Sequence, residues 1–104
     1  MTSDRSDWLA QEISDLLDVS AVGLYEFMEF LNDPDQPLAM SQRRAIALQA
    51  LERLMQEPGM QLHWRRWSQF DDLGHVALGD LPEAAWDPPR ETDGLYVAIE
   101  RRAG

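Results

Sequence analysis

Two histidines, His63 and His75, are the only imidazole groups in this chain of 104 residues and the first candidates for chemistry. Both fall in a predicted β-hairpin, whose turn we expect near Asp71 and Asp72. That turn would place His63 opposite residues 78–80, so the two histidines would not be direct cross-strand neighbours. No carboxylate accompanies them at metal-ligand spacing. The pattern therefore favours ordinary hairpin histidines over a metal or catalytic site.

The remaining side chains give no catalytic pattern. The chain has no cysteine, which excludes disulfides, thiolate metal sites and cysteine nucleophiles. It has no Gly-x-Ser-x-Gly elbow and no glycine-rich phosphate loop. Glu26 and Glu29 have helical i, i+3 spacing, but an acid–base pair also needs a cleft and a shifted pKa, which a sequence does not reveal. We expect a protein that is not an enzyme and that holds no metal and no cofactor.

The distribution of arginine is the strongest clue to a different function. All nine basic residues are Arg, against nineteen Asp and Glu, and the net charge is −10. Residues 1–42 carry a net charge of −8, residues 43–70 one of +3 and residues 71–104 one of −5. The central segment is therefore a basic island in an acidic chain. Its candidate contacts to nucleic-acid phosphates are Arg43, Arg44, Arg65 and Arg66.

This basic island supports two interpretations. In a DNA-binding winged helix, a recognition helix and a wing carry such arginines to phosphates. Helical spacing sends Arg43, Arg44 and Arg53 in different directions, however, and the net charge repels DNA at long range. We therefore favour arginines that pair with the acidic N-terminal third of the same molecule, or with a second chain, over contacts to nucleic acid.

The acidic residues indicate a protein partner of positive charge, because complementary charge speeds association and suppresses wrong partners. They gather on the outer face of the first predicted helix, in a loop and at the hairpin tip. Two tryptophans beside the hairpin would extend such a surface, although packing within the fold is the favoured role of each. The candidate partner-binding residues are Glu12, Asp15, Asp18, Asp33, Asp35, Asp71, Asp72, Trp67 and Trp86.

Three predicted helices position these residues. Apolar residues recur with a 3.6-residue period over 6–18, 21–31 and 41–56. The second of these segments is apolar almost all round, which favours burial at the centre of the fold over a place in an interface. The sequence Pro58-Gly59 ends the third helix. The predicted N-caps are Ser6, Ser20 and Ser41.

After Gly59 the period of apolar residues changes to two, which is typical of strands. Residues 60–65 and 75–78 form the two strands of the predicted hairpin, and residues 95–99 form a last strand. The order is three helices, a hairpin and a final strand. We expect one α+β domain over residues 1–104, with the hairpin where a winged helix has its wing.

The composition also limits the cellular setting. No apolar run approaches the ~18 residues of a membrane span, and the N-terminal residues do not have the pattern of a signal peptide. An acidic surface is poorly suited to anionic membranes and to general nucleic-acid binding. We expect a protein of the bacterial cytoplasm with no membrane contact.

Three stretches carry a family resemblance: VGLYEFM at 22–28, RRAIALQALERLM at 43–55 and LYVAI at 95–99. Together with the hairpin they resemble small bacterial winged-helix-like domains of unknown function, some of which are similar to immunity proteins of polymorphic toxin systems. The resemblance covers roughly residues 20–100. It implies a toxin inhibitor that binds a cationic toxin domain directly.

Two other functions stay open from the sequence. A winged-helix transcriptional regulator would bind duplex DNA through the basic island. A small structural subunit would instead form a homodimer through the second helix. The three functions differ in their partner, which is a toxin, a DNA duplex or a second copy of the chain.

Overall fold

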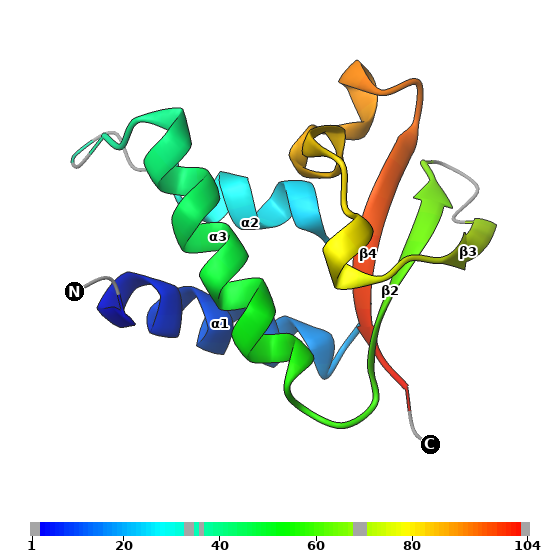
Figure 1. Cartoon of the computed structure of the whole chain (residues 1–104), viewed down its shortest axis with the longest axis horizontal. Helices are drawn as coiled ribbons and strands as arrows, with labels where there is room; N and C mark the ends of the chain where they lie inside the picture. Colours follow the sequence, from blue (N-terminus) through cyan, green and yellow to red (C-terminus); the bar gives the residue numbers. More distant parts are fainter. Residues whose placement is uncertain (1–2, 33–34, 36, 68–70, 103–104) are drawn as a thin grey trace.

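A computed structural model describes residues 3–32, 35, 37–67 and 71–102. These residues form a mixed α+β fold of three helices and a four-stranded antiparallel sheet, so the predicted α+β class is confirmed. Figure 1 shows the helices gathered on one side of the two long strands.

The helices are α1 (Ser3–Leu17), α2 (Leu24–Phe30) and α3 (Met40–Met55). α3 ends one residue before the predicted end, ahead of Pro58-Gly59. No helix in the described ranges is both long and apolar enough to cross a lipid bilayer.

The sheet consists of β1 (Val22–Gly23), β2 (Met60–Arg66), β3 (Asp71–His75) and β4 (Leu95–Arg101). Its spatial order is β1-β4-β2-β3, and each neighbouring pair is antiparallel. β4 therefore lies between the strand that follows α1 and the strand that follows α3. Three short 3-10 helices connect β3 to β4, at Leu78–Asp80, Glu83–Trp86 and Pro89–Glu91.

The start of the predicted second helix, 21–31, is wrong. Val22 and Gly23 pair with β4 and form a strand, so the order of elements has a strand between the first two helices. Gly23 then begins α2, and its N–H donates to the Glu26 carboxylate at 2.7 Å. A Cβ atom at this position would lie 2.4 Å from the Tyr25 ring, so a larger residue here would require that ring to move.

The predicted serine caps of the other helices are wrong as well. α1 begins at Ser3, so Ser6 lies inside the helix and is buried. α3 begins at Met40, and the Gln42 side chain accepts a hydrogen bond from the N–H of Ala39 at 3.0 Å. Both helices start before the apolar period does, because a first turn needs partners for its free N–H groups and not apolar contacts.

The predicted hairpin forms, but the residues predicted as its turn lie inside its second strand. Asp71 and Asp72 are residues of β3, which ends at His75, so the predicted turn at these aspartates and the predicted strand 75–78 are wrong. Gly74, with a φ of 128°, donates its N–H to the Asp72 carboxylate at 3.0 Å within the strand. The observed register places His63 directly opposite His75, which corrects the predicted separation.

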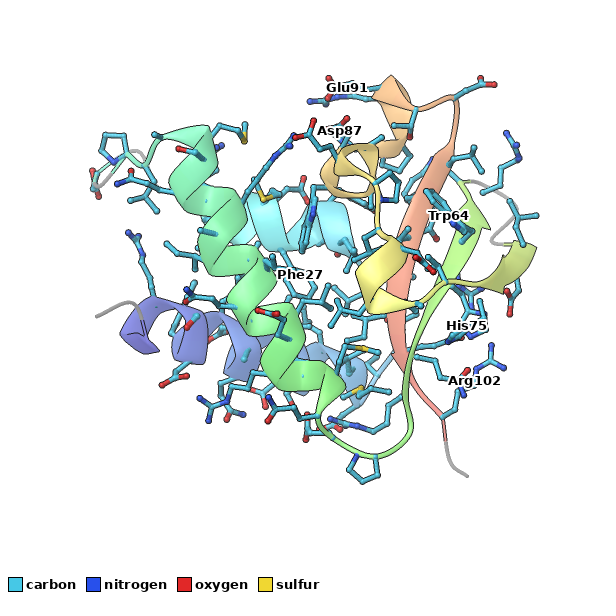
Figure 2. All side chains as sticks on the ribbon, viewed as in Figure 1. Phe27, Trp64, His75, Asp87, Glu91 and Arg102 are labelled. Atoms are coloured by element: carbon cyan, nitrogen blue, oxygen red, sulfur yellow. The ribbon has the colours of Figure 1, made fainter. Side chains whose placement is uncertain are left out.

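The helices pack on one face of the sheet through an apolar core. Alternation along β2 and β4 directs Leu62, Val97 and Ile99 into this core. Phe27 of α2 is fully buried and meets the Trp86 ring edge to face, with 5.9 Å between ring centroids. Figure 2 shows Phe27 in the crowded middle of the molecule. Leu24 and Phe27 of α2 are buried, but Glu29 is exposed and the other residues of the helix are half-buried, so the expected central burial of the second helix holds in part only.

Candidate partner-binding surface

The face of the sheet opposite the apolar core carries the polar groups of the two long strands, at buried and half-buried positions. Its side chains alternate with the core residues along each strand. We call this surface the open face. It comprises Gln61, His63 and Arg65 of β2 with Tyr96, Ala98 and Glu100 of β4.

A buried histidine links three strands on the open face. His63 Nδ1 lies 2.9 Å from Asp72 Oδ1 of β3, while its Nε2 lies 2.9 Å from Gln61 Oε1 and 3.3 Å from Glu100 Oε1. Arg102 also donates to both carboxylates, at 3.0 Å to Asp72 and 2.6 Å to Glu100. These bonds join the edge strand β3 to β2 and to the end of β4. Figure 2 shows His75 and Arg102 at this same end of the sheet.

His63, Asp72 and Glu100 also form a set of ligand atoms within 4.8 Å of one another, which could hold a metal ion. The expectation that no carboxylate accompanies the histidines is therefore wrong in three dimensions. The bonds already present oppose a metal. Arg102 binds both carboxylates, Arg65 donates to Glu100 at 2.7 Å, and one ion could reach only one nitrogen of the imidazole. The arrangement is better suited to an ion-pair network.

The acidity of these carboxylates follows from their partners. The N–H of Gly74 and then the His63 ring hold the pKa of Asp72 at about 2, below its usual 3.8. Burial by itself would raise the pKa of Glu100, but hydrogen bonds from Arg102 and Arg65 lower it overall. The negative charges of the network are therefore compensated within the molecule.

Three aromatic rings extend the open face, and we call them the aromatic patch: Tyr25, Trp67 and Tyr96. The ring of Tyr96 meets Tyr25 edge to face at 5.7 Å and Trp67 at 6.4 Å between ring centroids. Tyr96 is buried, whereas Trp67 is 50% exposed. The N–H of Trp67 donates to the Gly94 carbonyl at 2.6 Å, which anchors its backbone. Tryptophan and tyrosine are enriched among the residues that contribute most to binding at protein interfaces.

Two glutamates of α2, Glu26 and Glu29, flank the aromatic patch. Within the described part of the chain, no arginine lies within ion-pair distance of either carboxylate. Burial raises the pKa of Glu26 against the hydrogen bond from Gly23, and the charge of Glu29 adds to this rise. Burial, with Glu26 next in effect, raises the pKa of Tyr25 to about 12. These two glutamates thus keep an uncompensated negative charge.

The outer face of α1 contributes a second acidic surface. Asp15 is exposed and accepts a hydrogen bond from Gln11 at 3.0 Å, while Glu12 is half-buried. Asp18 is exposed but accepts a hydrogen bond from Arg101 at 2.5 Å. Of the three candidates on this helix, only Asp15 is both exposed and without an arginine partner in the described contacts.

The remaining acidic candidates do not join one surface. Asp35 is exposed, and Asp33 lies outside the described residues. The backbone of Asp71 forms part of β3, and the structure does not describe its side chain. Asp72 is bound in the His63 network rather than free at a hairpin tip.

The two candidate tryptophans have different surroundings. Trp86 is buried against Phe27 in the core, which confirms its favoured role in packing and removes it from the candidate partner-binding residues. Its apolar neighbours in the fold explain this, since the 3-10 helix Glu83–Trp86 lies over α2. Trp67 remains a candidate, and the structure adds Tyr25, Tyr96 and the glutamates of α2 to it. For these added residues, the sequence offers one indication only, which is that Glu26 and Glu29 form a narrow polar strip on an otherwise apolar helix.

The basic island is held by contacts within the molecule, but its partners differ from those expected. Arg44 lies 3.6 Å from Glu83 and 3.7 Å from Asp87, and Arg65 binds Glu100. These acids belong to the C-terminal third, so the predicted pairing of Arg44 and Arg65 with the N-terminal third is wrong.

Two further arginines of the island bind backbone carbonyls. Arg43 donates to Leu38 at 3.1 Å, and Arg66 donates to Asp93 at 2.9 Å. Arg53, which also belongs to the basic island, does bind Asp7 of the N-terminal third as expected. Arg101 of the C-terminal third binds Asp18. All four arginines proposed as phosphate contacts therefore have partners inside the molecule.

Comparison with protein-family models, with curated proteins and with solved structures finds no significant match to this chain.

The pKa of Asp72 predicts an acid-dependent loss of stability. Its folded value of about 2 lies below the ordinary 3.8, so its ionised form stabilises the fold above about pH 4, and this contribution disappears as the pH falls towards 2. Asp72→Asn should be less stable than the parent at pH 7, with the gap closing near pH 2. Urea unfolding at several pH values measures it. A gap that stays constant over this window, or one matched by the exposed control Asp15→Asn, would contradict the network.

Substitution by glutamine should change the free energy of unfolding in opposite directions at Glu26 and at Glu100. The folded pKa of Glu26 lies above its usual 4.5, so ionised Glu26 destabilises the native state at pH 7. Glu26→Gln keeps an acceptor for the N–H of Gly23 and should raise the free energy of unfolding, by under about 1 kcal/mol at this half-exposed site. Glu100→Gln should lower it. The effect of Glu26→Gln should vanish below about pH 4, whereas that of Glu100→Gln should persist to lower pH, until the pH falls through the lowered pKa of Glu100. Two changes of equal sign at pH 7 would refute the assignment.

Proposed function

We propose that this chain is a protein-binding domain, without catalytic activity, whose open face and α2 receive a cationic partner. The observation that carries the proposal is the meeting of two uncompensated glutamates, Glu26 and Glu29, with the exposed ring of Trp67. Tryptophan supplies apolar contact area at interfaces. A carboxylate that is costly to ionise in the free protein gains most from a cation brought by a partner.

The order of the elements supports a winged-helix-like fold. The chain runs α1, β1, α2, α3 and β2, and β4 returns between β1 and β2, as the last strand of a winged helix does. β3 and the three 3-10 helices stand where the wing would be. A DNA-binding protein of this class would carry free cations on its third helix and wing. Because Arg43 and Arg44 of α3 are bound within the molecule, the electrostatics favour a protein partner over DNA.

Within this class we assign an immunity role, in which the chain neutralises a cognate toxin in the bacterial cytoplasm by direct binding. A toxin that cleaves nucleic acid has a surface that attracts phosphates, and carboxylates can occupy the same surface. The sequence resemblance of residues 22–28, 43–55 and 95–99 to immunity-like domains supports this role. A homodimer is the structural alternative.

The proposal is tested with the product of the adjacent gene, purified and titrated into this chain by calorimetry. We expect a 1:1 complex whose affinity falls about tenfold or more as salt screens the opposite charges. Co-expression of the two genes should restore growth of cells that the partner alone inhibits. Absence of both the complex and the protection would reject the immunity role. A shift of duplex DNA at low salt, or dimerisation in light scattering, would support the alternatives instead.

Matched variants identify the surface. Glu26→Gln combined with Glu29→Gln should weaken the complex about tenfold or more, because it removes the two uncompensated charges. Glu52→Gln, an exposed change on α3, is the control and should have no effect. Reversal of the α1 surface by Asp15→Arg with Asp18→Arg gives the competing outcome. If only this reversal weakens binding, the partner uses α1 and the open face is not the interface.

A further inference from the structure

Tyr25 and Trp67 form the boundary between two adjoining depressions in the surface. One, of about 520 Å³, is lined by Tyr96, Glu26 and Arg65 among others. The second, of about 490 Å³, is lined by Glu29 and Asp93, by the prolines at 88 and 89, and by Arg90. Both include Tyr25 and Trp67. The buried Tyr96 ring contacts both of these rings and so lies at the base of the boundary between them.

Each depression has an excess of negative charge. In the first, Arg65 is bound to Glu100, which leaves Glu26 with its raised pKa and with no cation at ion-pair distance in the described residues. In the second, Glu29 and Asp93 outnumber Arg90. Glu26 and Glu29 are spaced i, i+3 on α2, so their carboxylates lie on one side of that helix. Glu26 lines the first depression and Glu29 the second, and both depressions share Tyr25 and Trp67.

We infer that this boundary receives one guanidinium group, an arginine side chain of the partner, stacked on the Trp67 ring and bonded to Glu26 and Glu29. The inference rests on the proposed function and names the group that is recognised. Guanidinium is planar and weakly hydrated, stacks on aromatic faces and presents several N–H donors. An ammonium group is strongly hydrated and gains less at a depression open to solvent. The proline wall at 88 and 89 offers apolar contact to the methylene stem.

The experiment uses a probe in place of the partner. The tripeptide acetyl-Gly-Arg-Gly-amide is titrated into isotopically labelled protein and followed by the Trp67 indole N–H signal, which Trp67→Phe identifies by its disappearance. The neutral isostere acetyl-Gly-citrulline-Gly-amide and the lysine tripeptide are titrated in parallel. We expect saturable binding of the arginine peptide, with the citrulline peptide about tenfold or more weaker and the lysine peptide intermediate.

Variants separate the parts of the site. Trp67→Ala should abolish the saturable shift. Because this variant lacks the indole N–H, binding is followed by the Gly94 amide signal. The double variant Glu26→Gln with Glu29→Gln should also abolish the shift. Trp67→Phe keeps an aromatic face and should retain part of the affinity, while Glu52→Gln should bind as the parent does. Equal binding of the arginine and citrulline peptides, or binding that survives Trp67→Ala, would overturn the inference.

The two proposals can fail separately. If the adjacent gene product binds and Glu26→Gln with Glu29→Gln weakens that complex, while the arginine peptide gives no shift, the guanidinium site is wrong and the partner-binding function stands. If the arginine peptide binds as expected while the adjacent gene product does not, the guanidinium site stands and that partner is wrong.

Discussion

The pairing of β4 with strands on both sides is the constraint on which the rest of the structure depends. β4 comes last in the chain, yet it lies between β1, which opens α2, and β2, which follows α3. Its alternating side chains place Val97 and Ile99 in the core and Tyr96 and Glu100 on the open face. The pairing of β4 with β1 and β2 therefore forms both the core and the open face. It brings together residues of β1 and β4 that are more than seventy positions apart in the sequence.

This arrangement divides the carboxylates into those that have cationic partners within the molecule and those that do not. The carboxylates of Asp72 and Glu100 meet His63, Arg65 and Arg102 and are more acidic than usual. The Glu26 carboxylate beside the aromatic patch is less acidic than usual, because it is partly buried and the charge of Glu29 opposes its ionisation. A net charge of −10 is thus not an even coat. The negative charge that is least favourable in the free protein, that of Glu26, lies beside Trp67. A cationic partner bound there would stabilise it.

Periodicity predicted the elements that depend on apolar contacts, and it failed where a polar or backbone contact decides. The spacing of apolar residues alone predicts the body of α3 and the strands at 60–65 and 95–99, which the structure extends to Arg66 and Arg101. The two-residue strand at Val22 is set by pairing with a segment at the far end of the chain, which no local pattern contains. The hairpin turn was misplaced because Asp72 and Gly74 have turn chemistry, yet they bond to each other inside a strand.

The site was predicted in part for the same reason. Trp67 could be predicted from its residue type alone. Tyr96 and Glu26 lie beside it because of the register of β4 and because β1 ends at Gly23, and no local pattern predicts either feature. Hydrogen–deuterium exchange of the complex with the adjacent gene product tests the central claim most directly, because it maps the covered backbone without any substitution. The account predicts that binding slows exchange in α2 and at residues 65–67 and 94–96. Slowed exchange confined to α1, or to α3, with these segments unchanged would contradict it.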